Sequence, residues 1–526
     1  MKLKSLLLTS VFCVGAALSA EAETLKWARA GDALTLDPHA QNEGPTITLG
    51  RQIMEPLVDR DMKGGLVPGL AIEWGPSESD PNVWTFTLRE GVKFHDGSDF
   101  DSEDVVFSMN RAMTEKSNYR EVLASVAEVR ATGPYTVEIV TKGPNPIMPN
   151  NLTNLLIMDK GWAEANGAVD VQDYEGGEST YAAKNANGTG PYKVVSREPD
   201  VKTVLERFDG YWGIGQFPME VSRIEALPIQ NPATRVAALL SGEVDFIQDV
   251  PVQDLSRVNG TESLDVRKAP QNRVIFFGMN QGDADLANDN VEGRNPLADV
   301  RVRQAMNVAI NREAIQKIVM RGQSEPAGVI IPPFVHGWTA ELDRVPSTDI
   351  ELAKDLMKEA GFEDGFSIKL DCPNDRYIND EAICQAAVGM FAQIGIDVNL
   401  DAKPKAQHFP LINNLESDFY MLGWGVPTYD SEYIFNFLVH TKGDAYGSWN
   451  NTRYSNAHLD KGIEELASET NLAARDETIS AIWQQVKEDV LYLPIHHQVL
   501  NWGMKARVDT NVDPEDSPKF KYFAFK

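Results

Sequence analysis

The sequence predicts an α/β protein made of two lobes. Two observations lead to this fold class. Apolar strands alternate with amphipathic helices along the chain, and one segment has a complete strand–helix–strand pattern. In that segment, residues 366–372 and 397–400 have strand patterns, and residues 380–394 form a helix with one apolar face. We expect the two strands to run parallel in one sheet, joined by a right-handed crossover.

The boundary between the lobes is expected near Gln271, where the character of the sequence changes. A continuous apolar strand at residues 274–279 is followed by a polar loop rich in Asp and Asn. A strand at residues 491–496 follows the last long helix and is expected to lead the chain back to the first lobe. The expected units are residues 23–272 for lobe I, 273–491 for lobe II and 492–526 for the return to lobe I. We expect hinges near residues 273–277 and 491–496.

The first 22 residues have the pattern of a secretory signal peptide. Lys2 and Lys4 precede an apolar core at residues 5–17, and Ala20-Glu-Ala22 fits a small-residue cleavage site. Cleavage there leaves 504 of the 526 residues and, with two lysines and one glutamate removed, changes the formal charge from −28 to −29. So acidic a chain repels phosphate backbones and anionic lipid, which argues against nucleic acid or a membrane surface as a partner.

The run from Trp84 to Arg111 is the most informative stretch of the sequence. Trp84, Phe86 and Leu88 alternate with threonines, as in a strand with one buried face. Asp101 and the acidic residue three positions later fit a helix N-cap and its capping-box partner. His95 and the nearby acidic residues could be a metal or catalytic cluster, but turn and cap chemistry is the better interpretation.

This run, together with several later motifs, resembles the family-5 extracytoplasmic solute-binding proteins, the peptide, nickel and oligopeptide-binding subunits of ABC importers. The later motifs are Gly188-Thr-Gly-Pro-Tyr192, the segment 235–245 ending in Leu-Ser-Gly-Glu-Val-Asp, and the segment 299–312. The resemblance implies a large periplasmic binding protein fold of the cluster C type, with an extra subdomain in lobe I at about residues 63–180. It also implies a protein that closes two lobes around a ligand without chemistry.

Enzyme motifs are absent from the sequence. It contains no Gly-x-Ser-x-Gly nucleophile elbow, Walker loop, His-Glu-x-x-His or dinucleotide-binding glycine fingerprint. A secreted hydrolase therefore has no candidate arrangement of catalytic residues. His496 and His497 are the one adjacent histidine pair, and neighbouring strand residues point to opposite faces, so the pair cannot chelate one ion in regular geometry. We expect no cofactor and no metal site.

Two cysteines remain after signal cleavage, and export makes a disulfide between them permissible. Cys372 would lie at the end of a strand and Cys384 in the first turns of the following helix. A bond between them would contribute about 3 kcal/mol through loop closure. Two thiolates alone fall short of the four ligands that zinc prefers.

The resemblance implies two regions of ligand contact. In several family members the loop before the first helix touches ligand, which here corresponds to Asn42, Glu43, Gly44 and Thr46; a plain surface turn is the equally supported alternative for each residue. Dipeptide binders hold the ligand carboxylate with an arginine before a lobe II helix, and Arg376 lies at about that position. A guanidinium matches the two oxygens of a carboxylate. The alternative is an arginine paired with a neighbouring aspartate, Asp375 or Asp380.

The segment Gly423-Trp-Gly-Val-Pro427 departs from the pattern of peptide-binding relatives. These relatives place an aspartate three residues after the tryptophan, where it binds the amino group of the peptide, but this chain has Pro427 there. Asp430 could substitute, although a turn or helix-cap role is slightly favoured. Trp424, flanked by Gly425, is the aromatic residue expected to touch ligand, with Tyr429 as a second candidate. Trp449 is more typical of a core position.

Taken together, these features predict a monomeric periplasmic binding protein that delivers a solute to an ABC transporter permease. The expected ligand is a small peptide or an amino-acid-derived compound, with Arg376 binding its carboxylate and Trp424 covering it. The alternatives within the same role are an oligosaccharide, an opine or a nickel complex.

Overall fold

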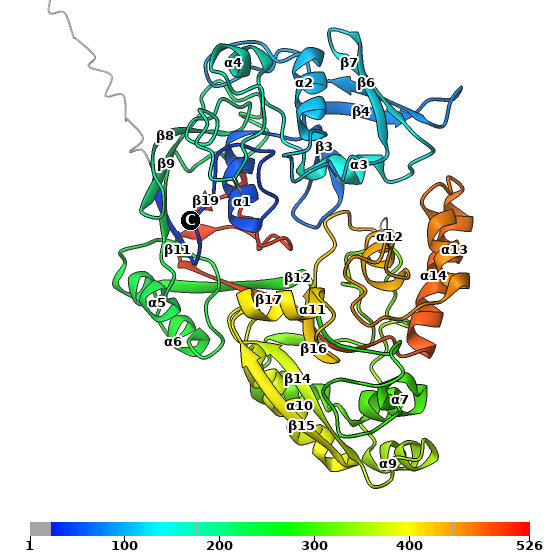
Figure 1. The fold of residues 1–526 in the computed structure, drawn as a ribbon. Helices are drawn as coiled ribbons and strands as arrows, with labels where there is room; N and C mark the ends of the chain where they lie inside the picture. The colour runs from blue at the N-terminus through cyan, green and yellow to red at the C-terminus, as the bar shows by residue number, and fades with distance from the viewer. Residues whose placement is uncertain (1–22, 121, 175, 444–445) are drawn as a thin grey trace, which may run out of the picture.

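The structure is a computed structural model that describes residues 23–526, except residues 121, 175 and 444–445. The predicted signal peptide, residues 1–22, lies outside the described residues. Figure 1 shows the chain arranged in an upper and a lower part, which two long strands connect. These strands are β12 (Leu264–Met279) and β17 (Tyr492–Lys505), and both are longer than the sequence pattern predicted.

One mixed sheet runs through both lobes, with β12 and β17 antiparallel at its centre. On the lobe II side, the strands continue from β12 as β16 (Phe419–Trp424), β14 (Phe366–Pro373) and β15 (Ile396–Lys403). On the lobe I side, they continue from β17 as β11 (Phe246–Ile247), β1 (Thr24–Arg29), β10 (Arg223–Pro228), β9 (Lys202–Arg207) and β8 (Tyr192–Glu198). The short strand β13 (Ser324–Pro326) also pairs with β17.

The register of the β12–β17 pair is interrupted where the two lobes meet. Leu264 to Pro270 pair with residues from Lys505 to Val499, and pairing resumes at Val274 opposite His497. Pro270 has no N–H to donate, and such irregularities bend a strand locally. The proposed boundary between residues 272 and 273 falls within this interruption. β17 begins among lobe II strands, so the return to lobe I takes place along the strand itself.

Lobe I is built around β1, which lies between β10 and β11 and runs parallel to both. Helix α1 (Gly44–Ile53) follows, with the Glu43 side chain as its N-cap. The core is rich in aromatic rings: Trp502 and Phe520 both pack against Phe246. The remaining elements of this lobe are α4 (Lys160–Ala165), α5 (Pro232–Ser241), α6 (Leu255–Asn259), β18 (Val508–Asp509) and β19 (Ala524–Phe525).

A subdomain with its own four-stranded antiparallel sheet is inserted in lobe I. Helix α2 (Ser102–Ala112) has the predicted capping box. The side chain of Asp101 accepts from a backbone N–H in the first turn, and the side chain of Asp104 accepts from the backbone N–H of Asp101. His95 lies in a turn, and its Nε2 is 2.9 Å from the carbonyl of Gly190. The strands are β4 (Ala71–Pro76), β5 (Val83–Leu88), β7 (Thr136–Thr141) and β6 (Val126–Gly133), with β2 (Val58–Arg60), β3 (Leu66–Pro68) and α3 (Met148–Asn151) at its base.

Lobe II contains the predicted strand–helix–strand unit. β14 and β15 pair in parallel from Phe366 opposite Ile396, and α10 (Asp380–Phe391) connects them. The other helices of the lobe are α7 (Val300–Ala309), α8 (Arg312–Ala314), α9 (Ile350–Glu359), α11 (Lys405–Asn413), α12 (Ser431–Ile434), α13 (Ala457–Leu466) and α14 (Leu472–Glu488).

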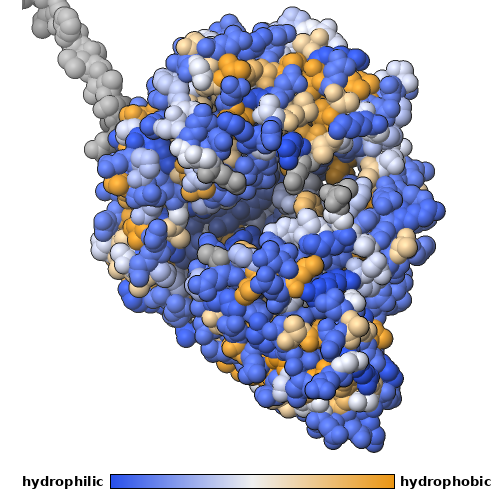
Figure 2. All heavy atoms as spheres, in the orientation of Figure 1, coloured by the Kyte–Doolittle hydropathy of each residue, from blue (hydrophilic) through white to orange (hydrophobic). Residues whose placement is uncertain are grey.

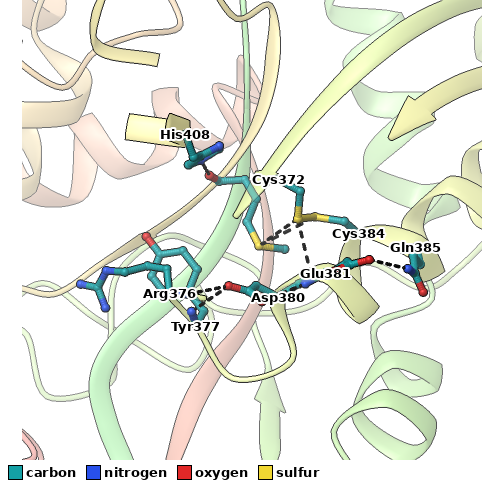
Figure 3. Close-up of a disulfide and its surroundings, with 9 residues drawn as sticks. Cys372, Arg376, Tyr377, Asp380, Glu381, Cys384, Gln385 and His408 are labelled. Atoms are coloured by element: carbon teal, nitrogen blue, oxygen red, sulfur yellow. Dashed lines mark hydrogen bonds between the residues drawn. A yellow bond between two sulfur atoms is a disulfide. The ribbon is translucent and has the colours of Figure 1, made fainter. Parts of the chain in front are cut away.

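The predicted disulfide between Cys372 and Cys384 is present and joins the end of β14 to α10 (Figure 3). Both cysteines are fully buried, and the sulfur of Met421 is in van der Waals contact with both of their sulfur atoms. The bond fixes the strand end from which the loop carrying Arg376 departs, so it lies next to the predicted ligand region.

Candidate functional site

A cleft separates the two lobes, and Figure 2 shows the surface deeply hollowed between the upper and lower parts. Strands β12 and β17 connect the upper and lower parts of the molecule (Figure 1). At its outer side, a cavity of about 470 Å³ is lined by residues of both lobes, including Arg60 and Asn150 from lobe I and His336 and Tyr429 from lobe II. A cleft between two lobes is the usual place for a small-molecule site.

Arg376 lies in lobe II, in the loop between β14 and α10. Its backbone N–H donates to the carboxylate of Asp380, which also accepts from the N–H of Tyr377. The guanidinium is exposed and, within the described residues, forms no ion pair with Asp375 or Asp380. It points away from the disulfide (Figure 3). The alternative considered above, an ion pair between the Arg376 side chain and a neighbouring aspartate, is therefore not present among the described residues.

Arg273 lies beside Arg376, and both guanidiniums approach the ring of Tyr377. The guanidinium carbons lie 6.0 Å (Arg273) and 5.1 Å (Arg376) from the ring centroid. The tyrosine is held in place because its hydroxyl accepts a hydrogen bond of 2.8 Å from the N–H of Gly423. Burial, followed by the like charge of Arg376, lowers the pKa of Arg273 to about 10.

Arg29 is the last residue of β1 in lobe I. Its Nε and Nη1 atoms are buried without a hydrogen-bond partner. Burial lowers its pKa, and the nearby carboxylates of Asp516 and Asp249 act in the opposite direction. Asp516 also faces Arg273. Acidic groups therefore accompany the arginines, but none of them forms an ion pair with Arg29 or Arg273 among the described residues.

Trp424 is half-buried at the end of β16, and its indole N–H is buried without a partner. Its ring lies within 6.0 Å of the rings of Tyr433, Phe437 and Trp449, so Trp449 belongs to the same aromatic group. Gly425 follows where two backbones meet: a Cβ there would lie 2.9 Å from the carbonyl oxygen of Asn272. The glycine thus permits the chain after β16 to approach the backbone of β12 closely.

The predicted loop 42–46 begins α1. The carboxylate of Glu43 accepts from the backbone N–H of Thr46, and the hydroxyl of Thr46 accepts from the N–H of Leu34 at 2.9 Å. These two side chains are therefore occupied in capping the helix and holding the loop. Asn42 and Gly44 are exposed.

Asp430 is a helix cap, as the favoured interpretation predicted. It accepts from the N–H of Glu432 at the start of α12. Its two carboxylate oxygens also accept from Arg475 at 2.7 and 2.8 Å, and His336 lies 3.1 Å away. Burial opposes its ionisation, but these hydrogen bonds outweigh burial and lower its pKa to about 2. With both oxygens engaged, Asp430 does not stand in for the amine-binding aspartate that Pro427 replaces.

Tyr429 lies on the lobe II side of the contact between lobes and has a left-handed backbone, with φ of 56°. The guanidinium of Arg60 in lobe I stacks on its ring and donates to the carbonyl of Thr428 at 3.1 Å. The turn around Pro427 therefore faces the other lobe. A Cβ at Gly64 would approach the Tyr429 ring to 2.5 Å.

The adjacent histidines, His496 and His497, are both buried. Burial lowers the pKa of His496 to about 3, which keeps it neutral, and the Nε2 of His497 lies 2.7 Å from a carboxylate oxygen of Asp343. Within the described part of the chain, no group of three or more His, Cys, Asp and Glu side chains is placed to hold a metal ion. No helix there has the length and apolar character needed to cross a membrane.

Sequence reasoning missed Arg29, Arg273 and Asp516, which come together from three distant segments. Arg273 directly precedes the apolar run at residues 274–279, and a charge at the start of that run is the one signal that could have indicated it. No comparable signal marks Arg29, which stands between two alanines, or Asp516, which stands among other polar residues.

Comparison with known proteins agrees with this arrangement. The model of the bacterial extracellular solute-binding proteins, family 5 Middle, matches residues 65–446. The Escherichia coli dipeptide-binding protein is 27% identical over 473 residues, which cover 84% of each chain. The glutathione-binding protein GsiB of Salmonella paratyphi A is 27% identical over 440 residues, which cover 82% of this chain and 80% of the relative. The Helicobacter pylori periplasmic binding protein DppA, solved with the peptide STSA, has a TM-score of 0.75 at 21% identity and covers 96% of this chain and 98% of its own.

The chain is therefore a member of the bacterial extracellular solute-binding proteins of family 5. These are extracytoplasmic substrate-binding proteins of ABC transporters and are not enzymes. The fold is that of the cluster C periplasmic binding proteins.

Proposed function

We propose that this protein captures a small peptide or an amino-acid-derived solute in the cleft and delivers it to an ABC transporter permease in the periplasm. The observation that carries this proposal is the pair of guanidiniums, Arg273 and Arg376, that share the ring of Tyr377 without a carboxylate partner. Two forks of N–H donors at a cleft wall suit the carboxylate of such a ligand.

The aromatic group next to these arginines supports the same class of ligand. Trp424 offers a ring face and an unpaired buried N–H beside Gly425, at the point where β16 meets the hinge. An indole N–H in this position suits a carbonyl oxygen, as a peptide or acyl group would supply. The named relatives that bind a dipeptide, glutathione or the peptide STSA add support from sequence and fold.

Closure of the lobes completes the proposed mechanism. A ligand that contacts Arg376 on lobe II and residues of lobe I at once favours the closed state by its higher affinity for that state. The register interruption between Pro270 and Val274 is the proposed hinge. We further propose that the protein acts as a monomer after removal of residues 1–22.

The alternatives lack comparable support. Aromatic rings also suit an oligosaccharide, but a sugar leaves the two arginines without counter-charge. A nickel complex that relied on His496 would need an imidazole that is accessible, whereas this side chain is 2% exposed.

Isothermal titration with Ala-Ala and its C-terminal amide tests the proposal. The free acid should bind at least about tenfold more tightly than the amide, because a charge-assisted hydrogen bond contributes about 1.5–3 kcal/mol. Arg376→Met should remove most of this preference. Arg257→Met, which removes an exposed charge on α6, is the control and should leave it unchanged. Equal binding of acid and amide, or binding of neither, would contradict the proposal.

A further inference from the structure

Asn272 lies at the boundary between the lobes, where the register of the β12–β17 pair is interrupted. Pairing with β17 stops at Pro270 and resumes at Val274, so the polar groups between these two residues bond elsewhere. The backbone N–H of Asn272 donates to the carbonyl of Pro514 at 2.8 Å. Pro514 belongs to the segment that returns to lobe I, so this hydrogen bond fastens the proposed hinge to lobe I.

The side-chain amide of Asn272 binds lobe II. Its Nδ2 donates to the carbonyl of Val426 at 2.9 Å, and its Oδ1 accepts from the N–H of the same residue at 3.3 Å. The amide thus pairs with both backbone groups of Val426, as the backbone of a neighbouring strand would. Asn272 is 7% exposed and Val426 is fully buried, so water does not compete for these hydrogen bonds. One residue of the hinge is therefore bonded to both lobes.

The segment that Asn272 holds is also bonded to lobe I at its other end. Pro427 and Thr428 follow Val426 directly, and their carbonyls accept from the guanidinium of Arg60 at 3.4 and 3.1 Å. This short segment of lobe II is thus tied to the hinge on one side and to lobe I on the other. All of these hydrogen bonds are made together in the conformation in which the lobes touch.

The next residue along the hinge, Arg273, adjoins the proposed carboxylate site. Its guanidinium shares the ring of Tyr377 with the guanidinium of Arg376. Because the peptide bond between Asn272 and Arg273 is planar and rigid, a constraint on one of these residues restricts the other. Consecutive residues of the hinge therefore contact the proposed ligand site and the two lobes.

We infer that Asn272 is a positioning residue that couples ligand binding to closure of the lobes. A residue bonded to both lobes keeps all of its hydrogen bonds in one relative arrangement of the lobes, and their separation would leave a buried amide without partners. A ligand carboxylate at Arg376 and Arg273 holds the hinge in the same arrangement and gains affinity from it. The coupling rests on the proposed function and adds a positioning residue to it.

Small-angle scattering and isothermal titration with Ala-Ala test the coupling. Saturating Ala-Ala should reduce the radius of gyration of the unsubstituted protein. Asn272→Leu, which replaces the amide with an apolar group of similar size, should remove most of this reduction and weaken Ala-Ala binding about fivefold or more. Asn272→Asp keeps the shape and the acceptor but loses the donor to Val426, and it should act in the same direction. The preference for Ala-Ala over its C-terminal amide should persist in both variants, because Arg376 is unchanged.

Asn295→Leu is the matched control. Asn295 is 5% exposed, and its amide donates to the carbonyls of Asn280 and Asp283 at 3.0 and 2.9 Å, both in lobe II. This variant loses buried hydrogen bonds of the same kind within one lobe. It should therefore be less stable to urea but keep the Ala-Ala affinity and the ligand-induced compaction of the unsubstituted protein.

The outcomes separate the coupling from the proposed function. Full compaction and unchanged affinity in Asn272→Leu and Asn272→Asp would overturn the coupling, while a preserved preference for the free acid would leave the proposed function standing. Equal losses in Asn272→Leu and Asn295→Leu would also overturn the coupling, because general destabilisation would then explain both. If Ala-Ala does not bind the unsubstituted protein, the proposed function fails and the coupling fails with it. Circular dichroism of each variant confirms that it is folded.

Discussion

The guanidinium carbon of Arg60 in lobe I lies 4.0 Å from the ring centroid of Tyr429 in lobe II. The same guanidinium donates to the carbonyls of Pro427 and Thr428, at 3.4 and 3.1 Å. The turn that in peptide-binding relatives would carry an amine-binding aspartate therefore makes a contact between the lobes here. The contact forms without a ligand, so it stabilises the conformation in which the two lobes touch.

Gly64→Ala should weaken this contact. The new Cβ would approach Tyr429 Cε1 to 2.5 Å, so the Tyr429 ring would have to move or the lobes would have to separate. We expect a larger radius of gyration by small-angle scattering and weaker ligand binding. Gly91→Ala is the matched control, since Gly91 has a similar positive φ (73° against 87°) and its added Cβ would meet nothing within 4 Å. If the two variants behave alike, backbone strain and not the lobe contact is responsible.

Arg475→Met should destabilise lobe II. It would leave Asp430 buried without its bidentate partner, and Glu432 would lose a hydrogen bond of 2.9 Å. Breaking a buried pair by removing one partner costs about 3–5 kcal/mol. Urea unfolding measures the loss. Arg344→Met, which removes an exposed ion pair, should change the free energy of unfolding by less than about 1 kcal/mol. A small effect at Arg475 would mean that water enters and compensates.

Affinity for an acidic ligand should fall as the pH rises through 7. Asp516 has a raised pKa of about 7; it is protonated and neutral below that value and becomes negative above it, next to Arg29, Arg273 and Asp249. A bound anion raises this pKa further, so binding takes up a proton and affinity falls by at most about tenfold per pH unit. Titration calorimetry between pH 6 and 8 measures the slope. Asp516→Asn should flatten it, and an unchanged slope would assign the titration to another group.

Loss of the Cys372–Cys384 bond should lower the free energy of unfolding by about 3 kcal/mol, because the bond closes a loop between residues 12 positions apart. Guanidinium unfolding of the oxidised protein and of the Cys372→Ala, Cys384→Ala double variant compares the two states. Since Arg376 lies in the loop that the bond closes, ligand affinity should also decrease. Full stability in the double variant would show that packing around Met421 suffices.

Elements determined by local patterns were predictable from the sequence, whereas relations between distant segments were not. The Asp101–Asp104 capping box, the parallel β14–α10–β15 unit and the disulfide all depend on residues close in sequence. The full length of β12 was missed because the alternation that begins at Leu264 breaks at the adjacent charges Arg267 and Lys268. The first half of β12 is stabilised by pairing with β17.

The same distinction between local patterns and distant segments applies to the candidate site. Arg376 and Trp424 were recognisable because they stand in motifs that resemble a family. Arg29 and Asp516 are brought together by the order of strands in the central sheet and by the loop after β18, which no local pattern encodes. Arg29 is notable because two of its buried nitrogen atoms lack a hydrogen-bond partner, and a missing partner becomes visible only in three dimensions.

Native mass spectrometry of the protein purified from its own host tests the central claim most directly. The mass that dissociates from the cleft should be that of small peptides or amino-acid-derived compounds that carry a carboxylate, and Arg376→Met should reduce its occupancy. A single sharp mass of a neutral sugar or of a metal complex without carboxylates would contradict the proposed ligand class.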